Sequence, residues 1–197
     1  MVNLTYDDGP DPVWTPAVLD ALAEHQAGAT FFVLGPAAQR HPDLIARMRA
    51  EGHEVALHAD EHIRHSGLTG PQIARDAAAA LARLSVLGVV PRRWRAPWGT
   101  VTADTRVVAD RLGLELVHWT VDTHDWRGDT APEMFSECGP AFGPGAVVLM
   151  HDGLGPGAPR TGCATTVELT HRLLELAAAR DLPARSLRAA TVAEVAA

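Results

Sequence analysis

The sequence contains no lysine, so all 17 of its basic residues are arginine, and they are outnumbered by 24 acidic residues. The formal net charge of −7 argues against nucleic acid as a partner, because phosphate contacts need clustered positive charge. No segment approaches the roughly 18 to 20 consecutive apolar residues that span a bilayer. We therefore expect neither nucleic-acid binding nor insertion into a membrane.

Cysteine is scarce, and a leader segment is not recognisable. Cys138 and Cys163 have neither CxxC spacing nor the density of a disulfide-rich scaffold. The first ten residues, MVNLTYDDGP, lack the basic residues and the apolar run of a secretory signal. We expect a cytoplasmic protein if Met1 is the native start, and a secreted one if a leader has been removed. No motif indicates an obligate protein partner.

The composition and the apolar pattern predict one α/β domain covering residues 1–197. The chain is 47% hydrophobic and 21% charged, which is ordinary for a folded protein of this size. Short β-prone runs recur along it, and we predict strands at residues 3–6, 29–34, 54–57, 92–95, 114–119, 146–150 and 186–188.

Segments with helical periodicity lie between most of these strands. Thr69 and Gln72 have capping-box spacing at the start of a helix over residues 69–87, and Thr102 can cap a helix that runs to Gly113. Pro16 suits a first helical turn, and residues 161–180 form a further helix. The alternation implies a parallel sheet, either open or closed. Seven strands without a glycine-rich phosphate loop favour the closed barrel.

Polar residues that can carry chemistry follow the predicted strands at their carboxyl ends. In such barrels the active site is built where strands end and βα loops begin. Residues placed at random would also be scattered along the helices, so the coincidence itself indicates a site. The residues at these ends are Asp7, Asp8, His58, Arg95, Asp122, Asp125, His151 and Asp152.

Two of these residues, Asp8 and His58, suggest a metal centre together with His62. Asp8 lies in an Asp-Asp-Gly-Pro run, which by itself is equally consistent with a capped turn. His58 and His62 are four residues apart, so on a helical turn both rings would project from one face, which His65 would continue. Such a pair alone is more often solvated or packed. Combined, one carboxylate and two imidazoles leave an open position, as in a catalytic metal site.

The remaining strand-end residues suggest acid and base groups around that centre. Arg95 can orient a carboxylate through paired hydrogen bonds. Asp125 offers a charge and Trp126 beside it an apolar wall. His151 emerges from a buried strand, where a structural hydrogen bond is the ordinary role of a histidine, but at the active face it is a candidate general acid.

The motifs TYDDGP, HADEH, RAPWG, DTHDW and LMHD resemble, in order and approximate spacing, the five motifs of the polysaccharide deacetylase family, carbohydrate esterase family four. The resemblance covers about residues 3–152 and implies a distorted (β/α)7 barrel. It implies Asp7 as catalytic base and His151 as general acid. The other implied roles are metal ligation by Asp8, His58 and His62, positioning of Asp7 by Arg95, charge pairing of His151 by Asp125, acetyl-pocket walls from Trp126 and Leu149, and an oxyanion donor from the Trp98 backbone N–H.

Two positions depart from the family pattern. Ala59 stands where the family usually has Ser or Thr after the first metal histidine, and Trp98 stands where it usually has Tyr. Neither residue is a proposed metal ligand, and Trp98 would still provide the oxyanion donor, because that donor is its backbone N–H. They put substrate fit and loop rigidity in question.

Three functions remain open at this point. The first is metal-dependent deacetylation of N-acetylated amino sugars in chitin-like or peptidoglycan-like oligomers, although only 5% of the residues are aromatic. The second keeps the chemistry but acts on a small intracellular N-acyl compound. The third is a non-catalytic carbohydrate-binding or metal-binding barrel. We expect a divalent metal, with zinc as the default and cobalt, nickel or manganese as alternatives.

Overall fold

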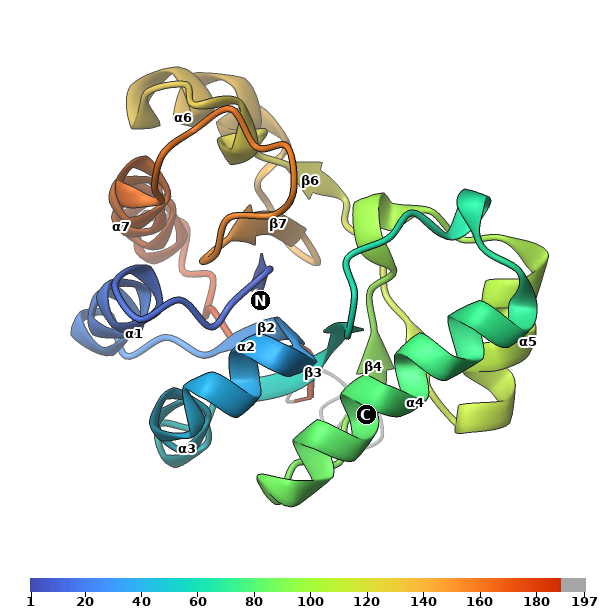
Figure 1. The fold of residues 1–197 in the computed structure, drawn as a ribbon. Coiled ribbons are helices and arrows are strands. Elements are labelled where there is room, and N and C mark those ends of the chain that lie inside the picture. The colour runs from blue at the N-terminus through green and yellow to red at the C-terminus, as the bar shows by residue number, and fades with distance from the viewer. Residues whose placement is uncertain (189–197) are drawn as a thin grey trace, which may run out of the picture.

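The computed structural model describes residues 1–188 and contains one seven-stranded parallel sheet (Figure 1). The strands are ordered β5-β4-β3-β2-β1-β7-β6. Their bounds are β1 Asn3–Asp7, β2 Ala29–Leu34, β3 Glu54–Ala59, β4 Arg93–Trp94, β5 Glu115–Leu116, β6 Val121–Asp122 and β7 Val147–His151. Strand β1 lies between β2 and β7 and is buried along its whole length, including its polar residues Asn3, Thr5 and Asp7.

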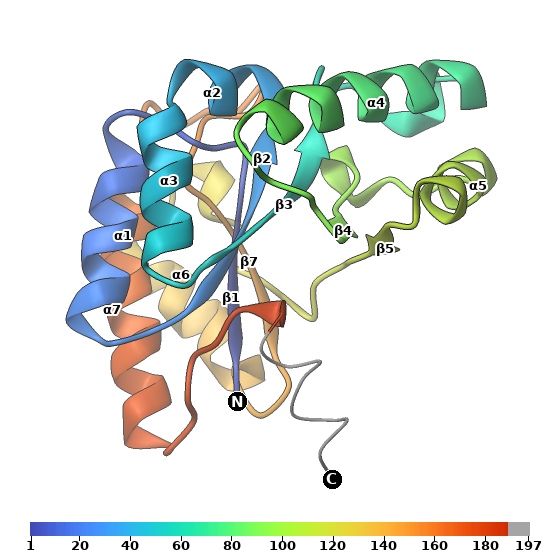
Figure 2. The same cartoon turned by 90° about the horizontal axis from the view of Figure 1, so that it is seen from below.

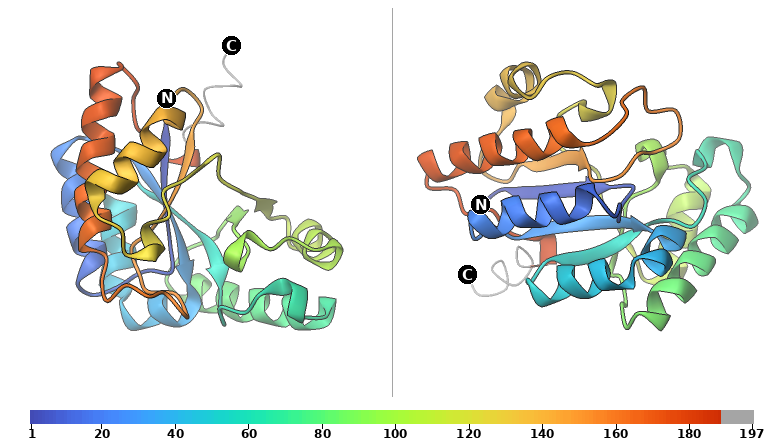
Figure 3. Two further views of the ribbon diagram at one scale, coloured as in Figure 1. Left: turned by 90° about the horizontal axis from the view of Figure 1, so that it is seen from above. Right: turned by 60° about the vertical axis from the view of Figure 1, so that its left-hand side comes forward.

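Helices lie outside the curved sheet. They are α1 Trp14–Glu24, α2 Gly35–Arg40, α3 Pro42–Ala50, α4 Gly70–Val86, α5 Ala103–Leu112, α6 Ala131–Cys138 and α7 Ala164–Ala179. Helices α1 and α7 pack side by side along β1, and α3 lies beside them (Figures 2 and 3). Within residues 1–188, no helix has the length and hydropathy that crossing a membrane requires.

The sheet is a distorted (β/α)7 barrel that stays open between its edge strands β5 and β6, which confirms the predicted fold class. These two strands follow one another in the chain but do not pair within the described residues. The prediction of one strand over residues 114–119 is therefore wrong in detail. After β5 pairs with β4, the chain leaves that edge, and β6 joins the opposite edge beside β7.

The predicted strand at residues 186–188 is also wrong. Residues 187 and 188 begin a helical turn, and only Ala184 makes a bridge, to Val2. The cause is visible in the hydrogen bonds. The Leu187 N–H donates to Oγ1 of Thr30 and the Arg188 N–H to Oε2 of Glu54, so side chains take the place of a neighbouring strand.

The starts of α4 and α5 follow their capping residues, as predicted. Thr69 and Gln72 form the predicted capping box of α4. Thr102 accepts a hydrogen bond from the Thr105 N–H at the start of α5, and Gly113 ends that helix with a φ of 66°.

Candidate active site

The site lies at the carboxyl ends of β1, β3 and β7. Asp7 is the last residue of β1 and pairs with His151, the last residue of β7. Asp8 leaves the strand with a φ of 73°, so strand alternation no longer applies and both carboxylates line the same cavity. Gly155 permits a close approach here, because a Cβ atom at that position would lie 2.3 Å from Oδ2 of Asp8.

Asp8, His58 and His62 form a group that fits a divalent cation. One ligand atom from each lies within 4.8 Å of the other two. Oδ1 of Asp8 lies 3.4 Å from Nε2 of His58 and 3.3 Å from Nε2 of His62. Tetrahedral ligands bound at about 2.0 to 2.1 Å are separated by roughly 3.3 to 3.4 Å. Across residues 1–188 the buried Oδ1 atom has no hydrogen-bond partner, which also fits a role as a ligand of a cation.

The protonation states of Asp8 and His62 suit a metal. Burial alone would raise the pKa of the Asp8 carboxyl, but the neighbouring histidines lower it to about 2. Burial lowers the pKa of His62 to about 4, so this imidazole is neutral at pH 7. Nδ1 of His58 donates a hydrogen bond to the Arg95 carbonyl oxygen at 2.7 Å, which leaves Nε2 facing Asp8.

The two histidines do not share a helical turn, so that part of the prediction is wrong. His58 belongs to β3 and His62 to the loop after it. Strand and loop geometry bring the rings to a centroid distance of 5.0 Å. His65 does not continue their face. It is buried, its Nδ1 lies 3.0 Å from the hydroxyl of Thr105, and the pair belongs to the packing beneath α5.

Arg95 binds the Asp7 carboxylate and does not itself line the cavity. Its Nη1 donates to Oδ1 of Asp7 at 2.9 Å and to the hydroxyl of Thr5 at 2.8 Å. The guanidinium is fully buried and stacks over the Phe32 ring, with 4.2 Å between its Cζ and the ring centroid. A buried arginine without freedom to turn fixes the carboxylate that faces the cavity.

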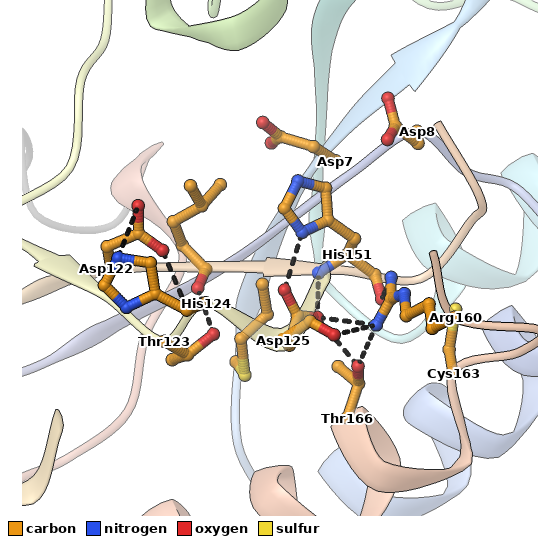
Figure 4. A network of polar contacts seen from close by, with 12 residues as sticks. Asp7, Asp8, Asp122, Thr123, His124, Asp125, His151, Arg160, Cys163 and Thr166 are labelled. Carbon is orange, nitrogen blue, oxygen red and sulfur yellow. Dashed lines mark hydrogen bonds and ion pairs between the residues drawn. The ribbon is translucent and has the colours of Figure 1, made fainter. Parts of the chain in front are cut away.

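His151 is paired with Asp125 on the other side of the cavity (Figure 4). Nδ1 of His151 donates to Oδ1 of Asp125 at 2.7 Å, and the His151 backbone N–H donates to Oδ2 at 2.9 Å. Burial opposes the charged form of His151, but Asp125 outweighs it and raises the pKa of the imidazole to about 9. In Figure 4 the other edge of the ring points toward Asp7. The pair therefore presents a proton donor opposite a carboxylate.

Two further members of this network, Arg160 and Thr166, were not predicted from the sequence. Arg160 donates to Oδ2 of Asp125 at 3.0 Å, and the hydroxyl of Thr166 donates to the same oxygen at 2.7 Å. Both residues follow a glycine- and proline-rich segment with no recognisable motif. An unexplained arginine just after such a segment was the only available signal.

A cavity of about 410 Å³ connects these groups. This volume lies within the usual range of small-molecule sites. Eight of the ten predicted site residues line it, while Arg95 and Asp125 lie behind Asp7 and His151. Leu149 is 4% exposed at its wall, whereas Trp98 and Trp126 are exposed at its rim. Residues 155–158 line the cavity, and so does Arg160.

Comparison with known proteins gives consistent matches. Residues 1–117 match the family described as polysaccharide deacetylase. A chitooligosaccharide deacetylase from Bradyrhizobium is 42% identical over 176 residues, which are 88% of this chain and 80% of that protein. A peptidoglycan-N-acetylglucosamine deacetylase from Listeria monocytogenes is 35% identical over 77% of this chain but only 32% of its own length.

Solved structures agree with the sequence matches. The family 4 carbohydrate esterase from Streptomyces lividans, solved in complex with acetate, is 29% identical, with a TM-score of 0.82 over 93% of this chain and 90% of that one. Because it covers 93% of this chain, the similarity extends past residue 117. This chain belongs to the polysaccharide deacetylase family.

Proposed function

We propose that this protein is a metal-dependent hydrolase that removes acetyl groups from N-acetylated amino sugars in chitin-like or peptidoglycan-like oligomers. One observation carries the proposal. Three convergent metal-ligand atoms lie in the same cavity as a carboxylate held by a buried arginine and a histidine held by a buried aspartate. This combination provides an electrophilic centre, a base and an acid for amide hydrolysis.

Zinc is the metal that we propose for Asp8, His58 and His62. The donor set of two imidazole nitrogens and one carboxylate oxygen, with near-tetrahedral spacing of the donor atoms, supports this choice. The chemistry that such an ion supplies is polarisation of the acyl carbonyl and a lowered pKa of the attacking water.

Asp7 takes the role of general base. Its carboxylate lies beside the metal ligands, and Arg95 limits its rotation. A base held in this way can accept the proton of the attacking water without first reorganising.

His151 takes the role of general acid. Its pKa of about 9 keeps the ring protonated at neutral pH, so a proton is available when the C–N bond breaks. Donation to the departing nitrogen avoids expulsion of an amide anion. Asp125 binds Nδ1 and so directs Nε2 toward the cavity.

The pocket walls account for recognition of an acetyl group. Leu149 is buried beside His151, and Trp126 adds an apolar ring at the rim, so both are placed to enclose a methyl group. Trp98 sits in a tight turn with a φ of 53°, and we assign its backbone N–H to the developing oxyanion. The exposed rings of Trp98 and Trp126 suit the faces of sugar rings.

The test is acetate release across a panel of chitooligosaccharides, peptidoglycan fragments, acetylated monosaccharides and small N-acyl amides. We expect release from N-acetylglucosamine oligomers by the zinc-loaded protein and none after metal is removed. Asp7→Asn should abolish release while the protein retains its metal, as measured by elemental analysis. Activity on small amides but on no sugar would overturn the substrate assignment. Full activity of the metal-free protein would overturn the mechanism.

A further inference from the structure

Arg160 connects the wall of the cavity to the proposed acid. It lies on the segment between β7 and α7, and its side chain is only 4% exposed. The same segment, at residues 155–158, lines the cavity. Arg160 therefore links the cavity wall at residues 155–158 to the residues that hold His151.

Arg160 donates hydrogen bonds both to the Asp125–His151 pair and to the segment that follows β7. Nη1 donates to Oδ2 and to the backbone oxygen of Asp125, at 3.0 and 3.1 Å, and to the hydroxyl of Thr166 at 2.7 Å. Nη2 donates to the carbonyl oxygens of His151 at 3.3 Å and Gly153 at 3.1 Å. Figure 4 shows the guanidinium beside the carboxylate, on the far side from the imidazole. A planar fork with several donors suits this arrangement, and an ammonium does not reproduce it.

Charge balance gives Arg160 a role during the reaction. Asp125 is fully buried, and a buried carboxylate without a counter-charge is costly. While His151 is protonated, its ring supplies part of that counter-charge. Once the proton has passed to the leaving nitrogen, the ring is neutral and Arg160 is the remaining cation in contact with Asp125 among residues 1–188.

We propose that Arg160 is a positioning residue for amine departure, which holds Asp125 in place and compensates its charge after His151 has given up its proton. The inference rests on the proposed hydrolase function and adds a residue to it. The reaction balances without a further reactant: His151 gives one proton to the nitrogen as the C–N bond breaks, and the ring becomes neutral. Arg160 itself exchanges no proton.

Leaving groups of different basicity separate this role from a purely structural one. An amine must be protonated to depart, whereas 4-nitrophenolate leaves from 4-nitrophenyl acetate without a proton. In Arg160→Met we expect kcat for N-acetylglucosamine oligomers to fall by about a hundredfold, near the lower limit for loss of acid catalysis. The kcat for 4-nitrophenyl acetate should remain within threefold of that of the unmodified protein. Arg160→Lys, which keeps the charge, should recover part of the oligomer activity.

Arg172→Met is the matched control, because Arg172 is an exposed arginine on α7 that pairs only with Glu168 among the described residues. It should leave both activities unchanged. An equal loss on both substrates in Arg160→Met, or no loss on either, would overturn the inference. If Arg160→Met does not fold, Thr166→Val provides the same comparison with a smaller loss, and an equal loss on both substrates would again overturn it. Failure of the unmodified, metal-loaded protein on every N-acetylated sugar would instead count against the proposed function.

Discussion

The two ends of strand β3 hold buried charge in opposite ways. At its start, Glu54 is fully bonded, with Oε1 accepting from Arg93 at 2.8 Å and Oε2 accepting from Thr30 at 3.2 Å and from the Arg188 N–H at 2.8 Å. Beyond its end, Asp8 lies against His58 with one buried oxygen that no group in residues 1–188 satisfies. Protein groups alone satisfy the hydrogen-bonding capacity of the Glu54 carboxylate, while Asp8 has an oxygen free to bind a ligand.

The largest expected effect comes from the incomplete end. Asp8→Asn removes a negatively charged metal ligand. Loss of a residue that only hydrogen-bonds to a metal ligand lowers activity by up to roughly a hundredfold, so acetate release should fall by more than that. The midpoint of thermal unfolding without metal should change much less than the activity, because the buried Oδ1 atom has no hydrogen bond to lose and only its ion pairs with His58 and His62 are removed. Activity assays, elemental analysis and calorimetry with chelator measure both effects. A large loss of metal-free stability with metal still bound would reverse our reading of this site.

The satisfied end should respond in the opposite way. Glu54→Gln removes the charge from a pair that is 8% exposed on both sides, so the free energy of unfolding should fall by about 3 kcal/mol. The kcat should not change, because Glu54 lies at the other end of the strand. Urea denaturation tests this, with Glu168→Gln as the exposed control, for which we expect less than about 0.5 kcal/mol. An equally small change in both variants would show that the Glu54 network does not hold the fold.

An intermediate effect concerns pH. In kcat/KM, the alkaline limb reports the pKa of His151, because only the protonated ring can act as acid. Activity is therefore present below that pKa and lost as pH rises through it. Asp125 raises the pKa to about 9, so in Asp125→Asn the value should return toward 6.5 and the limb should move down by about two pH units.

The decisive measurement compares the alkaline limb of kcat/KM in the unmodified protein with that in Asp125→Asn. A bound cation lowers the pKa of the nearby His151 in both, so the difference between the two limbs is more informative than either position. An alkaline limb at the same pH in both proteins would mean that a group other than His151 provides the proton.

The residues at the strand ends were predictable because their position follows from sheet geometry alone. Asp7 and His151 lie opposite each other because β1 and β7 are parallel neighbours that end together. The spacing of His58 and His62 indicated a chelating pair but not its backbone, since a strand followed by a loop brings the rings together as well as a helical turn does.

Long-range partners were the part that the sequence could not supply. Arg160 meets Asp125 across 35 positions of the chain, and no local periodicity encodes such a contact. The strand error at residues 186–188 has the same origin, because Glu54 and Thr30 take the backbone N–H groups that a neighbouring strand would have used. The local sequence pattern identifies helices and strands. Contacts between side chains that are distant in sequence determine where these elements end and which residues meet there.

The smallest expected effect lies at the rim of the cavity, away from both charged ends. Trp126 is 41% exposed and can cover one sugar face, so Trp126→Ala should raise KM for N-acetylglucosamine oligomers by about fivefold, near 1 kcal/mol. The kcat should change less, because Trp126 carries no proton and binds no metal. Val86→Ala, an exposed apolar residue at the end of α4, is the control. If KM is unchanged and kcat falls, Trp126 shapes the acetyl pocket instead of binding the sugar.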